Sequence, residues 1–203
     1  MHYVSREIGI DAAHREHQHG SKCFNIHGHR YKIQAVCSGG LATDGEQADM
    51  VVDFSFLKEA MMRQIDSFCD HGSIFSLDDP NIGSYVHGTL LEDVAKELLE
   101  AKNCLRQKGK TSSLNEILTN GSLDKNSLLD MFNKQGFLSC NERGPTFGKL
   151  YLIGPSPTAE ALAEHWFKKL SPSVEELSNK RAKLSNMVVS ETPNCVASYP
   201  LPM

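Results

Sequence analysis

The chain lacks the features that mark several large classes of proteins. No apolar run approaches the length of a membrane span, and the opening residues MHYVSREIGI lack the basic and apolar blocks of a signal peptide. The 21 basic and 25 acidic residues nearly balance, so no broad basic surface is expected. These absences favour a cytoplasmic protein with neither a nucleic-acid nor a membrane partner.

Paired cysteines are also missing. The six cysteines are scattered without a CxxC motif, and cytosolic thiols stay reduced, so we expect no disulfide framework. Histidine is placed unevenly, because six of the nine histidines fall within the first 29 residues. This segment is the first candidate for a functional site.

The length of 203 residues predicts one domain that buries a core. Alternation of apolar and polar residues predicts strands at 2–13 and from 29 to 39, joined by a polar loop over 14–28. We expect one face of the second strand to carry Tyr31, Ile33, Ala35 and Cys37.

Two segments have the spacing of amphipathic helices. The first follows MVVDF, can be capped by Asp53 or Ser55, and ends near residues 70–72. The second covers residues 155–172, and a charged connector is expected after it over 173–182.

Short strands are predicted at 149–154 and on either side of Thr192-Pro193-Asn194. The middle of the chain is predicted to form helical stretches at 89–107, 112–119 and 124–135. Without this middle, the order of elements predicts an α+β protein whose antiparallel sheet is covered on one face by helices.

His27-Gly28-His29 is the sharpest local motif. Residues i and i+2 of a strand point to the same face, so both imidazoles can reach one ion. His14 ends the opening strand, would lie opposite them in a hairpin, and is the natural third ligand of an open zinc site. The alternative is a solvated pair without metal, which is how we interpret the second HxH motif, His17 and His19.

Three further positions have both a functional and a structural interpretation. Cys23 is either a catalytic thiol, favoured by Lys22 and a nearby cation, or an inert cysteine. Asp70-His71 is either a proton-relay pair or a polar helix end. Glu191 either accepts two parallel hydrogen bonds from a guanidine-like ring edge or is a surface residue.

Six motifs occur in the order in which one known family has them: AAH (12–14), CFNIHGH (23–29), MVVDF with Leu57-Lys58 (50–58), DH (70–71), PTAE (157–160) and ET (191–192). Over residues 1–79 and 151–203 the chain thereby resembles the 6-pyruvoyl-tetrahydropterin synthase / 6-carboxytetrahydropterin synthase family. The resemblance implies a T-fold, which is a four-stranded antiparallel sheet with two helices between strands two and three. It implies one T-fold domain over 1–203 with a helical insertion at 80–148, and homo-oligomers built as hexamers from two trimers.

The same resemblance implies roles for individual residues. Zinc (Zn2+) would be held by His14, His27 and His29. The catalytic residues would be Cys23 as base, with Asp70 and His71 as proton-relay partners. The pterin substrate would be bound by Glu191 at its amino-pyrimidine edge and by Thr158. Candidates for phosphate contact, by proximity alone, are Lys22, Arg15 and Arg30.

The spacing of three residues between Cys23 and the HGH motif resembles the carboxytetrahydropterin synthases of the queuosine pathway. These lyases convert 7,8-dihydroneopterin triphosphate to 6-carboxy-5,6,7,8-tetrahydropterin. Alternatives are a 6-pyruvoyl-tetrahydropterin synthase on the same substrate and a non-catalytic pterin-binding T-fold module. A third is a protein whose insertion docks a partner through Leu90, Val94, Leu98 and Leu105.

Overall fold

The computed structural model describes residues 1–88, 91–92, 96, 135–141 and 148–201. The chain divides into two compact units. Unit 1 comprises Met1–Ala12, Gly28–His71 and Thr158–Met203, and unit 2 comprises Ala13–His27 and Gly72–Pro157.

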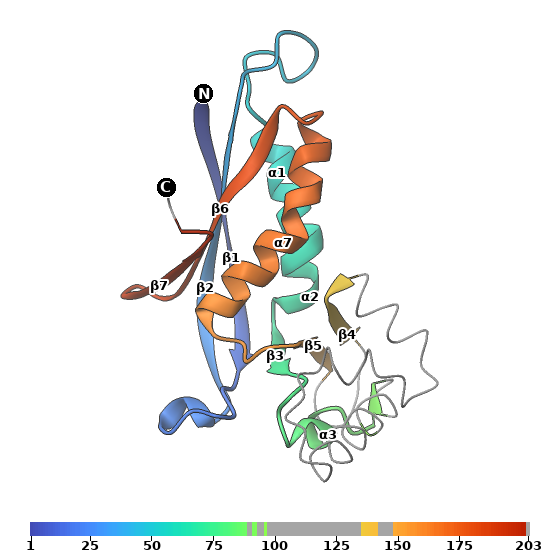
Figure 1. Cartoon of the computed structure of the whole chain (residues 1–203). Helices are drawn as coiled ribbons and strands as arrows, with labels where there is room; N and C mark the ends of the chain where they lie inside the picture. The colour runs from blue at the N-terminus through green and yellow to red at the C-terminus, as the bar shows by residue number, and fades with distance from the viewer. Residues whose placement is uncertain (89–90, 93–95, 97–134, 142–147, 202–203) are drawn as a thin grey trace, which may run out of the picture. The chain divides into compact units, whose positions relative to one another are not determined.

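The strands of unit 1 follow the order β1-β2-β6-β7 (Figure 1). They are β1 (His2–His14), β2 (His27–Gly39), β6 (Ala182–Thr192) and β7 (Cys195–Tyr199). Strand β6 pairs antiparallel with both β2 and β7. The strands predicted at the start of the chain, from residue 29 and around Thr192-Pro193-Asn194 are therefore confirmed.

The apolar face of β2 forms part of the core of unit 1. Its side chains alternate between buried and more exposed positions, because successive residues of a strand point to opposite faces. The expected set is confirmed, since none of its members has any exposed surface: Tyr31, Ile33, Ala35 and Cys37.

The first predicted helix follows β2 as a continuous run of α1 (Phe54–Met61), η2 (Met62–Asp66) and α2 (Ser67–Cys69). Asp53 is its cap, because one carboxylate oxygen accepts hydrogen bonds from the amides of Ser55 (2.6 Å) and Phe56 (3.3 Å). This cap confirms one of the two residues that the sequence proposed.

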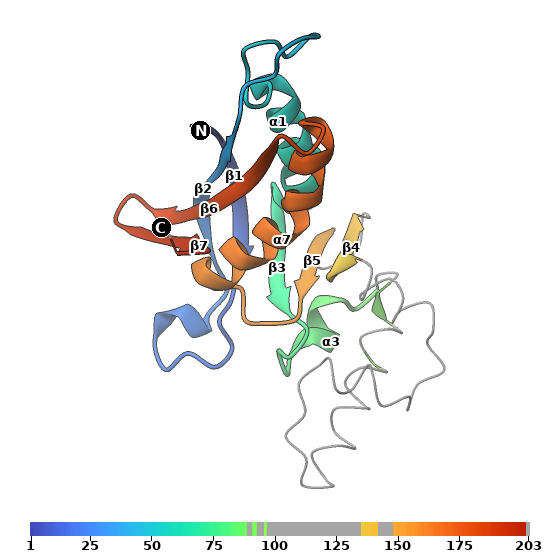
Figure 2. The same ribbon diagram turned by 45° about the horizontal axis from the view of Figure 1, so that its top comes forward.

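Helix α7 (Ala159–Leu177) packs on β6 and β7 and beside α1. Figures 1 and 2 both show α1 and α7 next to each other on the same face of the sheet. The sheet of unit 1 is thus covered by helices on that face, as predicted.

The connector predicted over 173–182 is wrong in its first half, because α7 continues through Pro172 to Leu177. A proline inside a helix removes one backbone hydrogen bond. Here the buried stripe of the helix continues beyond it, through Leu162, Ala163, Trp166, Leu170 and Val174. Burial of that stripe outweighs the local cost of the proline.

Unit 2 has three strands in the order β4-β5-β3. They are β3 (Gly72–Ser76), β4 (Phe137–Asn141) and β5 (Lys149–Ile153), and the short helices are η1 (Lys22–Phe24) and α3 (Ile82–Tyr85). Strand β5 pairs parallel with β3 and antiparallel with β4. The core of this unit is formed by Phe75, Leu77, Ile82, Tyr85, Val86, Leu91, Leu138, Cys140, Leu150 and Leu152.

The α+β class is confirmed, but the prediction of a four-stranded, wholly antiparallel sheet is wrong. The described residues form seven strands, and β3 and β5 run parallel. Strands β3 and β4 were missed because each has only five residues, and their buried runs do not alternate as a half-exposed strand does. A parallel pair joined by a connection of 72 residues leaves no local signal in the sequence.

The helices predicted at 89–107, 112–119 and 124–135 lie outside the described residues, apart from positions 91, 92, 96 and 135. The insertion at 80–148 and the single domain over 1–203 stay predictions. In the described part of the chain, no helix has both the length and the apolar character that a membrane span requires.

Helix α7 carries a histidine that should make stability depend on pH. Burial, and then the charges of Lys169 and Lys168, lower the pKa of His165 from 6.5 to about 4. Between pH 6.5 and about 4, His165 is therefore protonated in the unfolded chain but neutral in the folded chain. Because the unfolded state binds more protons, the free energy of unfolding should fall as the pH drops through this range.

Urea unfolding of the wild-type chain and of His165→Gln between pH 7 and pH 4 checks this expectation. We expect a smaller loss of stability in the variant over the window from 6.5 to about 4. Equal losses in the two proteins would contradict the assignment.

Candidate active site

His14 and His27 lie together in unit 2. His14 is buried, and its Nδ1 is 2.9 Å from the carbonyl oxygen of Pro157. The Nδ1 of His27 is 2.8 Å from the carbonyl oxygen of Asn25. A carbonyl only accepts, so each Nδ1 carries the proton and each neutral ring keeps its lone pair on Nε2.

The two Nε2 atoms face each other at 3.1 Å, and the ring centroids are 4.5 Å apart. Two lone pairs at this separation repel each other unless a positive charge, a proton or a metal ion, is shared between them. A histidine that ligates zinc typically donates its other N–H to a carbonyl, as both rings do here. Two nitrogens on a tetrahedral zinc ion lie about 3.4 Å apart, close to the observed separation. The pair therefore fits a metal.

His29 lies two residues further along β2, in unit 1. Its Nε2 is 3.9 Å from a carboxylate oxygen of Glu191 on β6, and both side chains are largely buried. The ring also meets the edge of Tyr31, with centroids 5.6 Å apart. The structure thus brings His29 close to Glu191. The resemblance implied a zinc ligand at His29 and a pterin-binding carboxylate at Glu191.

The sequence proposed His14, His27 and His29 as zinc ligands, of which His14 and His27 belong to unit 2 and His29 to unit 1. All three offer ring nitrogens, the donors that zinc accepts alongside thiolates and carboxylates. The binding of one ion by all three histidines stays a prediction.

Cys23 lies in η1, on the loop between β1 and β2, and is partly exposed. The carbonyl oxygen of Cys23 accepts a hydrogen bond from the amide of Glu16 at 3.0 Å, which fixes the loop that carries the thiol. Cys37, Cys69 and Cys140 are buried, and burial raises the pKa of Cys37 to about 12. Of the cysteines in the described residues, Cys23 and Cys195 reach solvent.

Asp70 and His71 form a dyad in unit 1. One carboxylate oxygen of Asp70 accepts from the amide of Asp11 at 2.9 Å, and the other lies 2.8 Å from Nδ1 of His71. The amide of His71 donates to the carbonyl oxygen of Asp11 at 2.7 Å. Asp70 is held by the backbone of β1 and in turn orients the imidazole, which leaves Nε2 turned away from Asp70.

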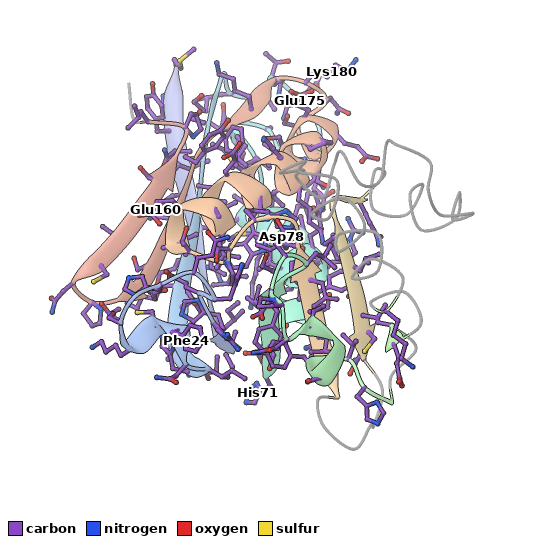
Figure 3. The ribbon with its side chains drawn as sticks, turned by 60° about the horizontal axis from the view of Figure 1, so that its bottom comes forward. Phe24, His71, Asp78, Glu160, Glu175 and Lys180 are labelled. Carbon is purple, nitrogen blue, oxygen red and sulfur yellow. The ribbon has the colours of Figure 1, made fainter. Side chains whose placement is uncertain are left out.

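The backbone of His71 is left-handed, with φ of 54°. This conformation is uncommon for a residue other than glycine, although histidine adopts it more often than most. It places His71 after the end of α2 with 78% of its side chain exposed, at the position marked in Figure 3. An oriented and accessible imidazole suits proton transfer.

Thr158 has a structural contact that the resemblance did not indicate. Its hydroxyl oxygen accepts from the amide of Ala161 at 3.2 Å and caps α7. The second HxH motif also has local contacts, because Nδ1 of His19 accepts from the amide of Ser21 at 3.1 Å.

Arg15 is the residue whose importance sequence reasoning missed, since it was considered only for phosphate contact. It is buried, and its Nε lies 3.5 Å from a carboxylate oxygen of Asp79, which is also buried. Its Nη1 donates to the hydroxyl of Tyr85, and its guanidinium lies 4.3 Å from the ring centroid of Phe24. Arg15 directly follows His14, and Phe24 directly follows Cys23. Through Asp79 and Tyr85, Arg15 therefore connects these parts of the chain to the segment that follows β3.

The other two phosphate candidates stay on the surface. Arg30 forms an ion pair with Asp11 at 2.8 Å and is 74% exposed, and Lys22 is exposed in η1. Only its burial distinguishes Arg15 from these residues, and the sequence gives no local signal of that burial.

Comparison with known proteins connects this geometry to a family. The family model described as 6-pyruvoyl tetrahydropterin synthase matches residues 3–201, so the chain belongs to the 6-pyruvoyl tetrahydropterin synthase family. The resemblance seen in the sequence motifs is thereby confirmed.

Among curated relatives, the 6-carboxy-5,6,7,8-tetrahydropterin synthase of Haemophilus influenzae is 39% identical over 92 residues, which is 45% of this chain and 64% of that protein. The chain therefore spans less than two thirds of that relative. The protein of the same name from Rickettsia felis is 25% identical over 191 residues, or 94% of each chain.

The solved structure of Plasmodium falciparum 6-pyruvoyl tetrahydropterin synthase superposes with a TM-score of 0.52, covering 97% of this chain and 95% of that one. The sequence identity is 16%, so this likeness concerns the fold alone. It agrees with a fold of the pterin-synthase type.

The pair Arg15–Asp79 should contribute far more to stability than the exposed pair Arg30–Asp11. Asp79→Ala leaves a buried guanidinium without its counter-charge and should cost about 3–5 kcal/mol of unfolding free energy. Arg30→Gln should cost about 1 kcal/mol or less.

Urea denaturation followed by circular dichroism measures both values. The double variant Arg15→Met/Asp79→Leu should recover most of the loss, because no buried charge remains unpaired. A loss for Asp79→Ala as small as that for Arg30→Gln would show that the pair is not buried in solution.

Proposed function

We propose that the chain is a zinc-dependent 6-carboxy-5,6,7,8-tetrahydropterin synthase that acts on 7,8-dihydroneopterin triphosphate. The observation that carries the proposal is the convergence of the His14 and His27 Nε2 atoms, each ring being fixed through Nδ1 by a backbone carbonyl. The names of two curated relatives point to the same activity, and family membership supports a tetrahydropterin synthase.

In this proposal zinc would be held by His14, His27 and His29, as the family resemblance implies, and it would supply Lewis-acid polarisation of the oxygens of the substrate side chain. The two carbonyls fix the tautomer of His14 and His27, so each neutral ring has its lone pair on Nε2, the atom that faces the other ring. The chain therefore presents a metal site that is already organised for binding.

Proton transfer is assigned to two groups on different elements. Cys23 would act as base through its thiolate, from the loop between β1 and β2. His71 would carry protons at Nε2, and Asp70 would keep its ring in the tautomer that has the proton on Nδ1. The exposure of His71 lets it exchange protons with water.

Substrate binding is assigned to Glu191 and Thr158. The carboxylate of Glu191 can accept two parallel hydrogen bonds from the amino-pyrimidine edge of a pterin. Thr158 would contribute to the pocket wall. Its hydroxyl oxygen already accepts a hydrogen bond from the amide of Ala161, which caps α7. In the overall reaction, the substrate and water would yield 6-carboxytetrahydropterin, acetaldehyde and triphosphate.

The second candidate is a 6-pyruvoyl-tetrahydropterin synthase on the same substrate, favoured by the description of the family model. A pterin-binding module without activity would lack one of the catalytic groups. Cys23, Asp70, His71 and the three histidines are all present.

We also propose a homo-oligomer, in line with the hexamers that the resemblance implies. A cavity of about 450 Å3 in unit 1 is lined by residues 49–55 and by the start of β1. Large apolar side chains are exposed around it: Tyr3, Leu41, Met50 and Phe54. Such a patch is the kind of surface that a second subunit covers.

The single domain over 1–203 remains part of the proposal, with the insertion at 80–148 carried as an addition to a T-fold core. Long insertions in surface loops are tolerated thermodynamically, since the closure entropy grows only slowly with length. The hydrogen bond of the buried Arg15 to Tyr85, which belongs to the insertion, supports a role of this segment in holding the site.

The product decides between the candidates. The zinc-loaded protein is incubated with 7,8-dihydroneopterin triphosphate, and the products are separated and weighed by mass spectrometry. We expect 6-carboxytetrahydropterin together with acetaldehyde. A pyruvoyl product would support the second candidate. If neither product forms, the assignment as a synthase is contradicted.

Two variants separate metal binding from proton transfer. Cys23→Ala should keep bound zinc but lose turnover by about 100-fold or more, because a positioned acid–base group is missing. His27→Ala should lose both zinc and turnover. Metal content by atomic emission and product formation measure the two effects.

Cys195→Ala is the matched control, because Cys195 is the other solvent-accessible cysteine of the described residues. It should retain both zinc and activity. Full activity in Cys23→Ala would remove the thiol from the mechanism.

A further inference from the structure

The loop that carries Cys23 has no buried side chain of its own. None of residues 16–27, all of which the structure describes, is buried. Backbone hydrogen bonds close the loop on itself, from the amide of Glu16 to the carbonyl of Cys23 at 3.0 Å and from that of His19 to the carbonyl of Glu16 at 2.9 Å. Such bonds fix the shape of a loop but not its place on the protein. That place depends on the ends of the loop and on side chains that reach buried groups.

Phe24, which directly follows Cys23, makes a contact of this kind. The Cζ atom of Arg15 lies 4.3 Å from the centroid of the Phe24 ring, whose position on the loop is labelled in Figure 3. Arg15 is 6% exposed, whereas Phe24 is 47% exposed. A guanidinium stacks on aromatic rings through its planar face, so the direction of the Arg15 plane sets where the Phe24 ring can lie.

The edge of the same guanidinium binds two other groups. Its Nη1 donates to the hydroxyl of Tyr85, and its Nε forms an ion pair with a carboxylate oxygen of Asp79 at 3.5 Å. The ion pair is longer than a hydrogen bond, and neither of its two atoms has a hydrogen-bond partner in the described part of the chain. The bond to Tyr85 is therefore the directional contact that orients the Arg15 plane.

Both partners of Arg15 are buried and held by other residues of unit 2. The ring of Tyr85 stacks on Phe75 of β3, with centroids 4.3 Å apart and planes 24° apart. The free carboxylate oxygen of Asp79 accepts from the amide of Asn81 at 2.9 Å. Tyr85 and Phe75 belong to the core of this unit, so the hydroxyl that receives the Arg15 bond has a fixed position.

We propose that Tyr85 is a positioning residue for Cys23. Its hydroxyl orients the guanidinium of Arg15, the guanidinium holds the ring of Phe24, and Phe24 places the thiol that precedes it in the chain. The inference rests on the proposed function, in which Cys23 is the base. It goes beyond that function because it gives a role in the reaction to a residue of the segment predicted as an insertion (80–148).

Tyr85→Phe is the informative variant. Asp79→Ala would leave a buried charge unpaired and lower the stability of the whole chain. Tyr85→Phe removes one oxygen atom and keeps both the ring that stacks on Phe75 and the ion pair. Tyr151→Phe is the matched control, because Tyr151 is also buried in unit 2 and stacks in the same way on Phe137, with centroids 4.6 Å apart.

Hydrogen–deuterium exchange read by mass spectrometry measures the loop, and steady-state kinetics of the zinc-loaded protein with 7,8-dihydroneopterin triphosphate measures the reaction. In Tyr85→Phe we expect residues 16–25 to exchange about threefold faster or more, with unchanged exchange in β6. The kcat should fall about tenfold because the thiol is less often in its reactive position. The KM and the bound zinc should stay as in the wild type, since the groups assigned to substrate and metal are untouched. Tyr151→Phe should match the wild type in every measurement.

Three outcomes would overturn the proposal. Equal exchange of residues 16–25 in Tyr85→Phe and the wild type would show that Tyr85 does not hold the loop. Faster exchange there with an unchanged kcat would show that the position of the loop does not limit the reaction. An equal fall of kcat in Tyr151→Phe, or faster exchange throughout the chain in Tyr85→Phe, would reduce the role of Tyr85 to stability.

The proposed function fails separately. A zinc-loaded wild-type chain without turnover would contradict the synthase, whereas the exchange of residues 16–25 would still decide whether Tyr85 holds the loop.

Discussion

The hydrogen bond from His14 Nδ1 to the carbonyl of Pro157 is the interaction on which the site depends. It joins residues 143 positions apart and is buried. It fixes the tautomer of His14 and directs Nε2 towards His27. It also links the end of β1 to Pro157, which follows the long middle of the chain and directly precedes Thr158, the cap of α7.

The same principle, an imidazole held through Nδ1, appears twice more with different partners. His27 is held by the carbonyl of Asn25, a neutral acceptor that leaves Nε2 available for a cation. His71 is held by the carboxylate of Asp70. The three rings are thus oriented by two kinds of acceptor, which are backbone carbonyls for His14 and His27 and a carboxylate for His71. Residue type alone does not make this distinction.

Much of the fold could be predicted from periodic patterns. The alternation in β2 gave its buried face, and the cap at Asp53 gave the start of α1, because both depend on neighbours in the sequence. The continuation of α7 through Pro172 could not be predicted, since it depends on the surface against which Val174 packs. Strand β3 was missed because its partner β5 lies more than 70 residues away.

The candidate site divides in the same way. The i, i+2 spacing of His27 and His29 and the order of the six motifs are properties of the sequence, and they sufficed to point to the family. The burial of Arg15 and the exposure of Arg30 were decided only by tertiary structure. The two residues are of the same type, but whether a guanidinium is buried against a carboxylate or exposed to water depends on segments far away in the chain. Local sequence sets which chemistry is available, and the fold decides which groups are desolvated and so which charges need a partner.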